Sequence, residues 1–247
     1  MKMTKLFIAA AMLAVSATAS AQFTNTAKTG SSSAVDTNGW GTFYLQWNPS
    51  TIKIDVNGID DQSFTGFSVG YNHAFGIVKN TPLFIETGVA LQYSFYTVNW
   101  KDDLKTTVPN CDPEDKYNML SAKVPVNLIY KFNIPNSNVA IAPYFGANLR
   151  FNISGKSKTE FNEDAGYEID KEYWENKYNK IEKDLFDKKD MESKDATWKR
   201  FQIGWQIGVN AHFGENFLLG ISYGSDFSEL YKKAKINTTS ITLGYKF

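Results

Sequence analysis

The chain has 247 residues, and its 26 basic and 26 acidic side chains give a formal net charge of zero at pH 7, so it lacks the basic field that recruits nucleic acid. The single cysteine, Cys111, excludes an intramolecular disulfide and a metal site built from several thiolates. Aromatic residues make up 15% of the chain beside 17 glycines, an enrichment typical of β-structure whose two faces differ.

The first residues have the pattern of a secretory signal peptide. Two lysines precede a short apolar stretch over residues 6–15, and Ala-Ser-Ala at 19–21 is a small-x-small cleavage site. The stretch is shorter than the roughly 20 residues of a transmembrane helix; the alternative is an uncleaved anchor or a buried helix. We therefore predict a signal peptide at residues 1–21. Residues 22–39, rich in Ser, Thr, Asn and Ala, cannot bury much apolar surface and are expected to form a flexible periplasmic leader.

From residue 40 onward, apolar residues alternate with small or polar ones in eight runs, the period of a strand with two unlike faces. The runs lie at residues 43–47, 67–71, 83–96, 120–132, 139–153, 201–213, 217–223 and 241–247. Several exceed the about 5–6 residues of an ordinary strand and match the roughly 9–11 that a tilted transmembrane strand needs. The pattern indicates an all-β domain over residues 40–247.

The connections between the runs alternate in length. Those at 76–81, 133–137 and 214–215 are short, whereas 98–116 and 155–197 are long. Short turns at one end and long loops at the other are the plan of an outer-membrane barrel. We therefore predict an eight-stranded antiparallel up-and-down transmembrane β-barrel whose two long loops are extracellular.

Two prolines fall inside the predicted strands. Pro125 and Pro143 cannot donate to a strand ladder, and a closed barrel has no free edge to hold them. We assign each to a β-bulge.

The volume of the lumen decides which face points outward. An eight-stranded barrel has an interior just wide enough for side chains to fill, and the apolar faces carry too many large residues for it. The bulky face is therefore expected to meet lipid, and the small and polar face to line the lumen. The charges within the runs fall on the lumen parity, as Glu86, Lys123, Lys131, Arg150, Arg200, Asp226 and Lys246. Aromatic residues gather near the ends of the lipid-facing runs, where membrane interfaces favour them.

At this point the sequence resembles a known group. The signal peptide, the eight amphipathic runs and the final segment Ile-Thr-Leu-Gly-Tyr-Lys-Phe resemble the small outer-membrane β-barrels of bacteria. These include the outer membrane protein beta-barrel domain family of Bacteroides-like bacteria, with its PorT-like members, and the OmpA/OmpX-type barrels. The resemblance implies an integral protein of the bacterial outer membrane, and it implies that Leu243, Tyr245 and Phe247 are the insertion signal for the barrel-assembly machinery.

The lumen charges are the first candidate site. Glu86, Lys123 and Arg150 lie on neighbouring runs, and buried charges need partners because isolated ones are costly to desolvate. We predict an ion-pair network that fills the lumen; the alternative is a gate or a narrow selectivity site. A hydrolytic enzyme would need a base beside a nucleophile, and the two histidines, His73 and His212, lie at strand ends without such a setting. We expect no catalytic residue.

The loop over residues 156–199 is the second candidate. Trp174, Tyr178, Ile181 and Leu185 have helical spacing, which predicts an amphipathic helix over residues 170–189 and a binding surface, a docking or lid element. A solvated surface loop is the alternative. The acidic residues near position 112 lack the ligand order of a calcium loop, so we expect no metal and no cofactor.

These observations predict a non-enzymatic barrel that anchors surface loops for envelope organisation, adhesion or partner binding. Its expected partners are outer-membrane lipid, the barrel-assembly machinery and an extracellular or envelope protein. The alternative function is a porin-like pore for small solutes or ions, or an accessory barrel of a protein secretion system.

Overall fold

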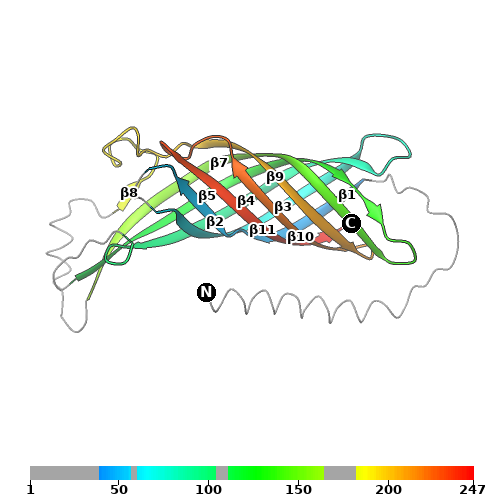
Figure 1. Ribbon diagram of the computed structural model, residues 1–247, viewed down its shortest axis with the longest axis horizontal. Coiled ribbons are helices and arrows are strands. Elements are labelled where there is room, and N and C mark those ends of the chain that lie inside the picture. The colour runs from blue at the N-terminus through cyan, green and yellow to red at the C-terminus, as the bar shows by residue number, and fades with distance from the viewer. Residues whose placement is uncertain (1–38, 57–59, 104–110, 164–181) are drawn as a thin grey trace. The chain divides into compact units, whose positions relative to one another are not determined.

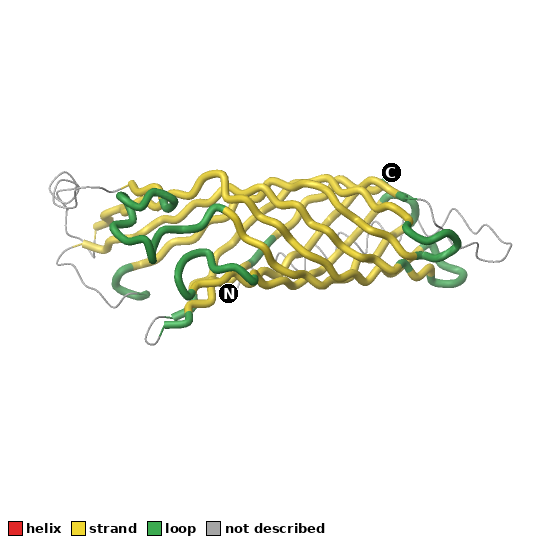
Figure 2. Tube along the Cα trace, turned by 90° about the horizontal axis from the view of Figure 1, so that it is seen from above, coloured by secondary structure: helices red, strands yellow, loops and turns green. Residues whose placement is uncertain are grey.

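The computed structural model describes residues 39–56, 60–103, 111–163 and 182–247. The predicted signal peptide and all of the leader but Gly39 lie outside these residues. Among the described residues, no helix is long and apolar enough to cross a membrane. Strands and turns make up the whole described part (Figure 2).

Eleven strands are described, several of them much longer than the strands of ordinary globular proteins. They are β1 Trp40–Trp47, β2 Ser50–Ile54, β3 Gln62–Gly76, β4 Leu83–Asn99, β5 Cys111–Tyr130, β6 Phe132–Asn133, β7 Val139–Glu163, β8 Glu182–Asp184, β9 Phe201–Phe213, β10 Phe217–Asp226 and β11 Ala234–Lys246.

The prediction of an eight-stranded antiparallel barrel is confirmed. Strand β1 pairs with β3 on one side and with β11 on the other, and the order β3-β4-β5-β7-β9-β10-β11 completes the ring (Figure 1). Strand β2 continues the line of β1 between β11 and β3, and β6 continues the line of β5 against β7. Strand β8 lies outside the ring, on the edge of β7. Consecutive strands of the ring are neighbours, which is the up-and-down plan.

The strands are tilted, as closure of a barrel requires. Starting at Trp47 and following the register through β3, β4 and β5, one arrives at Ser154 on β7. The opposite path through β11, β10 and β9 arrives at Pro143 of the same strand. The stagger between these two residues is the shear that inclines the strands to the barrel axis. Strands cross one another obliquely in both views (Figures 1 and 2).

The predicted orientation of the two faces is also confirmed. Large apolar side chains cover the outside, including Leu45, Val89 and Phe145, with exposures of 60, 62 and 58%. The inside carries buried polar residues, such as Gln92 and Ser121, and a few aromatic rings. Gly208 makes room for one of these rings, because a Cβ there would lie 2.5 Å from the ring of Tyr144. Only an apolar solvent explains so much exposed apolar surface in one continuous band.

The bulges predicted at Pro125 and Pro143 are wrong. The register is unchanged across Pro125, but β4 and β5 make no ladder pair opposite Gly88 and Val89. Pro143 likewise faces the gap between β5 and β6, around Lys131. Each proline therefore lies opposite a local gap in the hydrogen-bond ladder with one neighbouring strand. At that gap no N–H is required from the proline, so no bulge is needed.

The one register shift within the β5–β7 pairing occurs between Leu120 and Ser121, opposite Ile153. Beyond it, β5 and β7 continue well past the barrel. They occupy residues that the sequence predicted as the loops 98–116 and 155–197. Alternation continues there with Lys, Ser and Thr side chains, so the ladder continues although the apolar signal has ended.

We name the two ends of the barrel by their connections. The short-turn end holds the turns at residues 77–82, 134–138 and 214–216. The long-loop end holds the connection after β4, the segment from β7 to β9 and the turn between β10 and β11. Beyond this end, residues 96–99 of β4, 111–119 of β5, 155–163 of β7 and strand β8 form what we call the projecting sheet (Figure 2, left).

Candidate functional site

Polar side chains fill the lumen in hydrogen-bonded layers. In the layer toward the long-loop end, the guanidinium of Arg150 forms an ion pair with Asp226 and donates from Nε to Gln202 Oε1 at 3.2 Å. Asn152 also donates to Gln202 Oε1, at 2.7 Å, and accepts at 2.8 Å from the hydroxyl of Ser121. These side chains come from β5, β7, β9 and β10. They link four consecutive strands on one side of the barrel wall.

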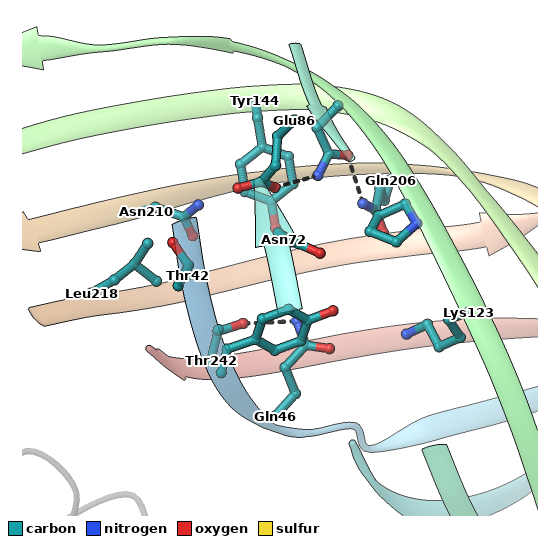
Figure 3. A pocket seen from close by; sticks show the side chains of 13 residues that line it. Thr42, Gln46, Asn72, Glu86, Lys123, Tyr144, Gln206, Asn210, Leu218 and Thr242 are labelled. Atoms are coloured by element: carbon teal, nitrogen blue, oxygen red, sulfur yellow. Dashed lines mark hydrogen bonds between the residues drawn. The ribbon is translucent and has the colours of Figure 1, made fainter. Parts of the chain in front are cut away.

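A second layer surrounds Glu86. Its Oε1 accepts a 3.0 Å hydrogen bond from Asn127 Nδ2, and the Asn127 Oδ1 accepts one of 2.6 Å from Gln206 (Figure 3). Glu86 and Lys123 both line a cavity of about 40 Å³, together with Tyr144 and other polar residues. A cavity of this size holds only a few water molecules.

The predicted network of Glu86, Lys123 and Arg150 is thus only partly assembled. All three side chains are buried in the lumen. Arg150 forms its ion pair with Asp226, whose lumen parity was visible in the sequence although its pairing with Arg150 was not. Lys123 stands opposite Arg150 in the register and is attracted by the same Asp226 carboxylate. Glu86 is held by amides and has no ion pair among the described residues.

Two further charged residues that the sequence placed in the lumen differ in their positions in the structure. Lys131 points inward, with its Nζ 5.0 Å from the ring centre of Trp40. Arg200, however, is exposed, and its guanidinium lies 4.4 Å from the ring centre of Phe186. Arg200 precedes the first residue of β9, so strand parity no longer sets its direction.

An apolar cluster closes the long-loop end of the lumen. Its buried members are Ile52, Phe64, Met119, Leu185, Trp198, Leu230, Ala234 and Ile236. Across it, the rings of Tyr96 and Tyr117 stack at 4.4 Å between centroids, and Trp198 continues the stack 6.4 Å from Tyr117. We call this group the apolar plug. Contacts of this kind leave little space for water.

The plug includes residues that the sequence placed on an exposed loop. Leu185, predicted as part of a binding surface, is fully buried, and Trp198 is 6% exposed. The backbone N–H of Leu185 donates to Gly155 O at 3.0 Å, and that of Trp198 donates to Leu185 O at 2.8 Å. The segment is therefore folded back into the mouth of the barrel.

The prediction of an amphipathic helix over residues 170–189 is wrong for residues 182–189, the part of this range that the structure describes. Residues 182–184 form β8, and turns follow it. A strand forms here because the edge of β7 offers free backbone groups over Lys156 to Lys158. Trp174, Tyr178 and Ile181 lie outside the described residues.

A smaller cluster closes the short-turn end. Trp40, Ala74, Phe84, Ile129, Ala142 and Tyr144 pack together there. His212 is buried edge-on against Trp40, 5.3 Å between ring centres, and neither of its ring nitrogens is hydrogen-bonded to any residue that the structure describes. His73 Nδ1 lies 3.2 Å from the Tyr71 hydroxyl. Within the described ranges, no Ser hydroxyl or carboxylate is hydrogen-bonded to either ring, as a hydrolytic triad would require.

The seam of the barrel lies at Phe247. Gly41 and Phe247 exchange two backbone hydrogen bonds of 3.0 Å, which join the two ends of the ring. The Phe247 ring lies over Gly41, where a Cβ would be 2.9 Å from two of its carbons, and packs with Phe43 and Tyr71. Leu243 and Tyr245 share its outward face and are also exposed.

Charged pairs cover the outer face of the projecting sheet. Lys116 on β5 donates to Glu160 on β7 at 2.5 Å, and Lys158 reaches the other oxygen at 3.4 Å. The hydrogen bond from Lys116 is the largest cause that lowers the pKa of Glu160, and Lys158 adds to it. Charges thus replace the apolar band just beyond Leu120, which marks the edge of the membrane-spanning part.

The acidic residues near position 112 are dispersed. Asp112 accepts from the Asn99 amide at 3.1 Å, whereas Asp115 accepts from Thr159 at 2.6 Å. Among the residues the structure describes, no three His, Cys, Asp or Glu side chains converge as they would around a metal ion.

Comparison with known proteins places this geometry in context. Residues 7–247 match the family described as outer membrane protein beta-barrel domain. No curated protein matches the chain. Among solved structures, the chain is similar to Ail, the attachment invasion locus protein of Yersinia pestis, at 15% identity over 85% of this chain and 99% of that one, with a TM-score of 0.41.

Two other solved structures give similar values. The Neisserial surface protein A has 15% identity over 84% of this chain and 97% of that one, with a TM-score of 0.38. OprG from Pseudomonas aeruginosa has 13% identity over 85% and 95%, with a TM-score of 0.32.

Proposed function

Since this chain belongs to the outer membrane protein beta-barrel domain family, we propose that it is a non-enzymatic barrel that anchors its projecting sheet at the cell surface for binding an envelope or extracellular protein. The protein is integral to the bacterial outer membrane. Short turns of such barrels face the periplasm and long loops face outward. The short-turn end is accordingly periplasmic and the projecting sheet extracellular.

The observation that carries the proposal is a lumen closed at both ends. The apolar plug fills the outer end, and the cluster around Trp40 and Phe84 fills the inner one. Between them lie polar cavities of about 40 and 20 Å³. An eight-stranded barrel has little interior to spare, so its function is assigned to what it holds outside the membrane.

The projecting sheet suits a binding role. Strand β3 accompanies β4 only to Phe95, and no other strand of the described part pairs with that edge of β4 beyond this residue. On the other side, β8 covers β7 only over residues 156–158. Unpaired strand edges are ready to accept an extended segment of another chain. The paired charges of the outer face give such a contact specificity more than strength.

The surroundings of the two histidines support the non-enzymatic part of the proposal, since His212 lies in the lumen and His73 on the outer face of β3. His212 packs against Trp40, and His73 meets a tyrosine hydroxyl. An enzymatic function would require lipid or peptide products that disappear in His73→Ala or His212→Ala variants.

The insertion signal is part of the same proposal. Leu243, Tyr245 and Phe247 lie in one outward row on the strand that closes the ring. We assign them to recognition by the barrel-assembly machinery. Replacing Phe247 with Ala should lower the fraction inserted in cells, while detergent refolding of the purified chain should change less.

The second candidate is a pore for small solutes or ions, or an accessory barrel of a secretion system. The polar cavities beside Lys123 favour it, because opening the plug would connect them to the outside. Planar-bilayer recordings separate the two functions. We expect no steady conductance from the intact protein, and a solute-sized conductance would exclude the proposed function.

Partner binding needs a test that leaves the plug in place. Removing residues 156–199 would also remove Leu185 and Trp198 and open the barrel. A photo-crosslinking residue at Lys158, on the projecting sheet, avoids this problem. Lys235, exposed on the far side of the ring, is the matched control position.

We expect a protein adduct in intact cells at position 158 and none at 235. The adduct should be lost in the double variant Lys116→Glu with Glu160→Gln, which reverses one charge of the surface ion pair and removes the other. Equal labelling at both positions, or none at either, would contradict a specific role for the projecting sheet.

A further inference from the structure

A furrow opens on the outside of the barrel, within the apolar band. It has a volume of about 370 Å³ and is lined by Ile85, Val126, Asn127, Leu128, Phe145, Gly146, Ala147, Gly204, Trp205 and Phe227. All of these except Asn127 are apolar or glycine. Asn127 turns its amide into the lumen, toward Glu86 and Gln206.

The register explains why a furrow forms there. One row across the barrel wall, Ile85–Leu128–Phe145, carries long outward side chains. In the next row, Val126–Ala147–Trp205, the central side chain is only the methyl group of Ala147. Phe227, whose N–H donates to Ile203 O at 2.8 Å, stands at the outer margin. The furrow therefore crosses several strands, with an alanine floor and aromatic walls.

We propose that this furrow holds one acyl chain of an outer-membrane lipid as a resident ligand. It is continuous with the band that already contacts the hydrocarbon, since Phe145 and Leu128 both belong to that band. An unfilled groove loses dispersion contacts along its lining. A flexible methylene chain can follow an oblique furrow, and it needs no hydrogen bond from the lining.

A second protein fits the furrow less well. Stable protein interfaces involve about 20–30 residues on each side, whereas ten residues line this one. A lipid is also present at high concentration wherever the barrel is inserted. The chain is therefore expected to stay bound longer than the lipids that surround the rest of the band.

The test uses the full-length protein extracted from outer membranes in a mild detergent. Ala147→Phe fills the floor of the furrow from a lipid-facing position, so the lumen is untouched. Leu149→Phe, two residues along on the same outward face of β7, is the matched control. Native mass spectrometry counts the lipids retained by each protein, and heat-dependent gel mobility confirms that each one is folded.

We expect one retained lipid in the wild type and in Leu149→Phe, and about a tenfold smaller bound fraction in Ala147→Phe. Equal retention in all three proteins would overturn the proposal, as would retention in none. A wild-type dimer that dissociates on Ala147→Phe would identify the furrow as a protein interface instead.

Trp205 gives an independent readout. Its emission is obtained as the difference between wild type and Trp205→Phe in phosphatidylcholine vesicles that contain acyl-brominated lipid. Quenching should be stronger in the wild type than in Ala147→Phe, because the added ring excludes the acyl chain from Trp205. Identical quenching would count against a lipid in the furrow.

Discussion

Replacing Asp226 with alanine removes the carboxylate that pairs with Arg150 inside the lumen. The two side chains are only 10% and 4% exposed, so water cannot replace the lost partner without entering the barrel. Lys123 lies beside the same carboxylate and would be left next to the unpaired guanidinium. Breaking a buried pair by removing one member costs about 3–5 kcal/mol, or roughly two to four orders of magnitude in the ratio of folded to unfolded protein.

The cost should be smaller when the Arg150 cation is removed as well, although Lys123 still loses the carboxylate that attracts it. Gln202 Oε1 still accepts from Asn152 after Arg150 is lost, so Arg150→Met with Asp226→Leu leaves no orphaned charge at that pair. Buried pairs replaced by apolar residues of similar size are often neutral in stability. Asp195→Ala is the surface control, because Asp195 pairs with Lys232 where both are exposed, and it should leave the midpoint unchanged.

Unfolding in urea, followed by the heat-dependent gel shift of lipid-reconstituted protein, measures the four proteins side by side. We expect Asp226→Ala to have the lowest midpoint of the four, with the double variant between it and the wild type. If Asp226→Ala unfolds with the wild type, or if the double variant is as unstable as the single one, the ion pair does not stabilise the lumen as argued.

Three further predictions follow from the seam, the plug and the projecting sheet. Gly41→Val should displace the ring of Phe247 and lower the folded fraction; its effect should not add to that of Phe247→Ala, because both changes disturb one contact. Trp198→Ala should destabilise the barrel by about 3–5 kcal/mol and produce conductance in planar bilayers; an unchanged current would mean that other plug residues suffice. Lys116→Met should raise the pKa of Glu160 toward its ordinary range, since Lys116 lowers it. Any stability from that pair is present above the ordinary carboxyl pKa and lost as pH falls through the lowered one, and a carbon-13 titration of Glu160 checks the direction.

Much of the barrel follows from the sequence because strand parity is a local property. The strict alternation around Val89 and Leu91 identified the strands and their two unlike faces. The small volume of the lumen then decided that the bulky face was outside. The prolines were harder. Whether Pro125 lies in a bulge or opposite a gap depends on how the neighbouring strand pairs with it, and the local sequence does not reveal that pairing.

The plug was not foreseen for a related reason. Leu185 has apolar neighbours at helical spacing, so it was assigned to the binding face of an amphipathic helix on a surface loop. The structure buries it instead against strands far away in the sequence, such as Ile52 and Ile236. The partner of Arg150 was missed similarly. Parity placed Asp226 in the lumen, but only the stagger of the strands brings it level with β7.

The seam at Gly41 and Phe247 has a consequence for biogenesis. The bonds that close the ring join Gly41 to Phe247, residues from the first and last strands of the barrel, and contacts at such separation in sequence form late and slowly. Until they form, β1 and β11 are both open edges, which invite pairing with other chains. An intermediate in which Phe247 has not yet paired with Gly41 is therefore prone to aggregation. We expect it to need a chaperone until the ring closes.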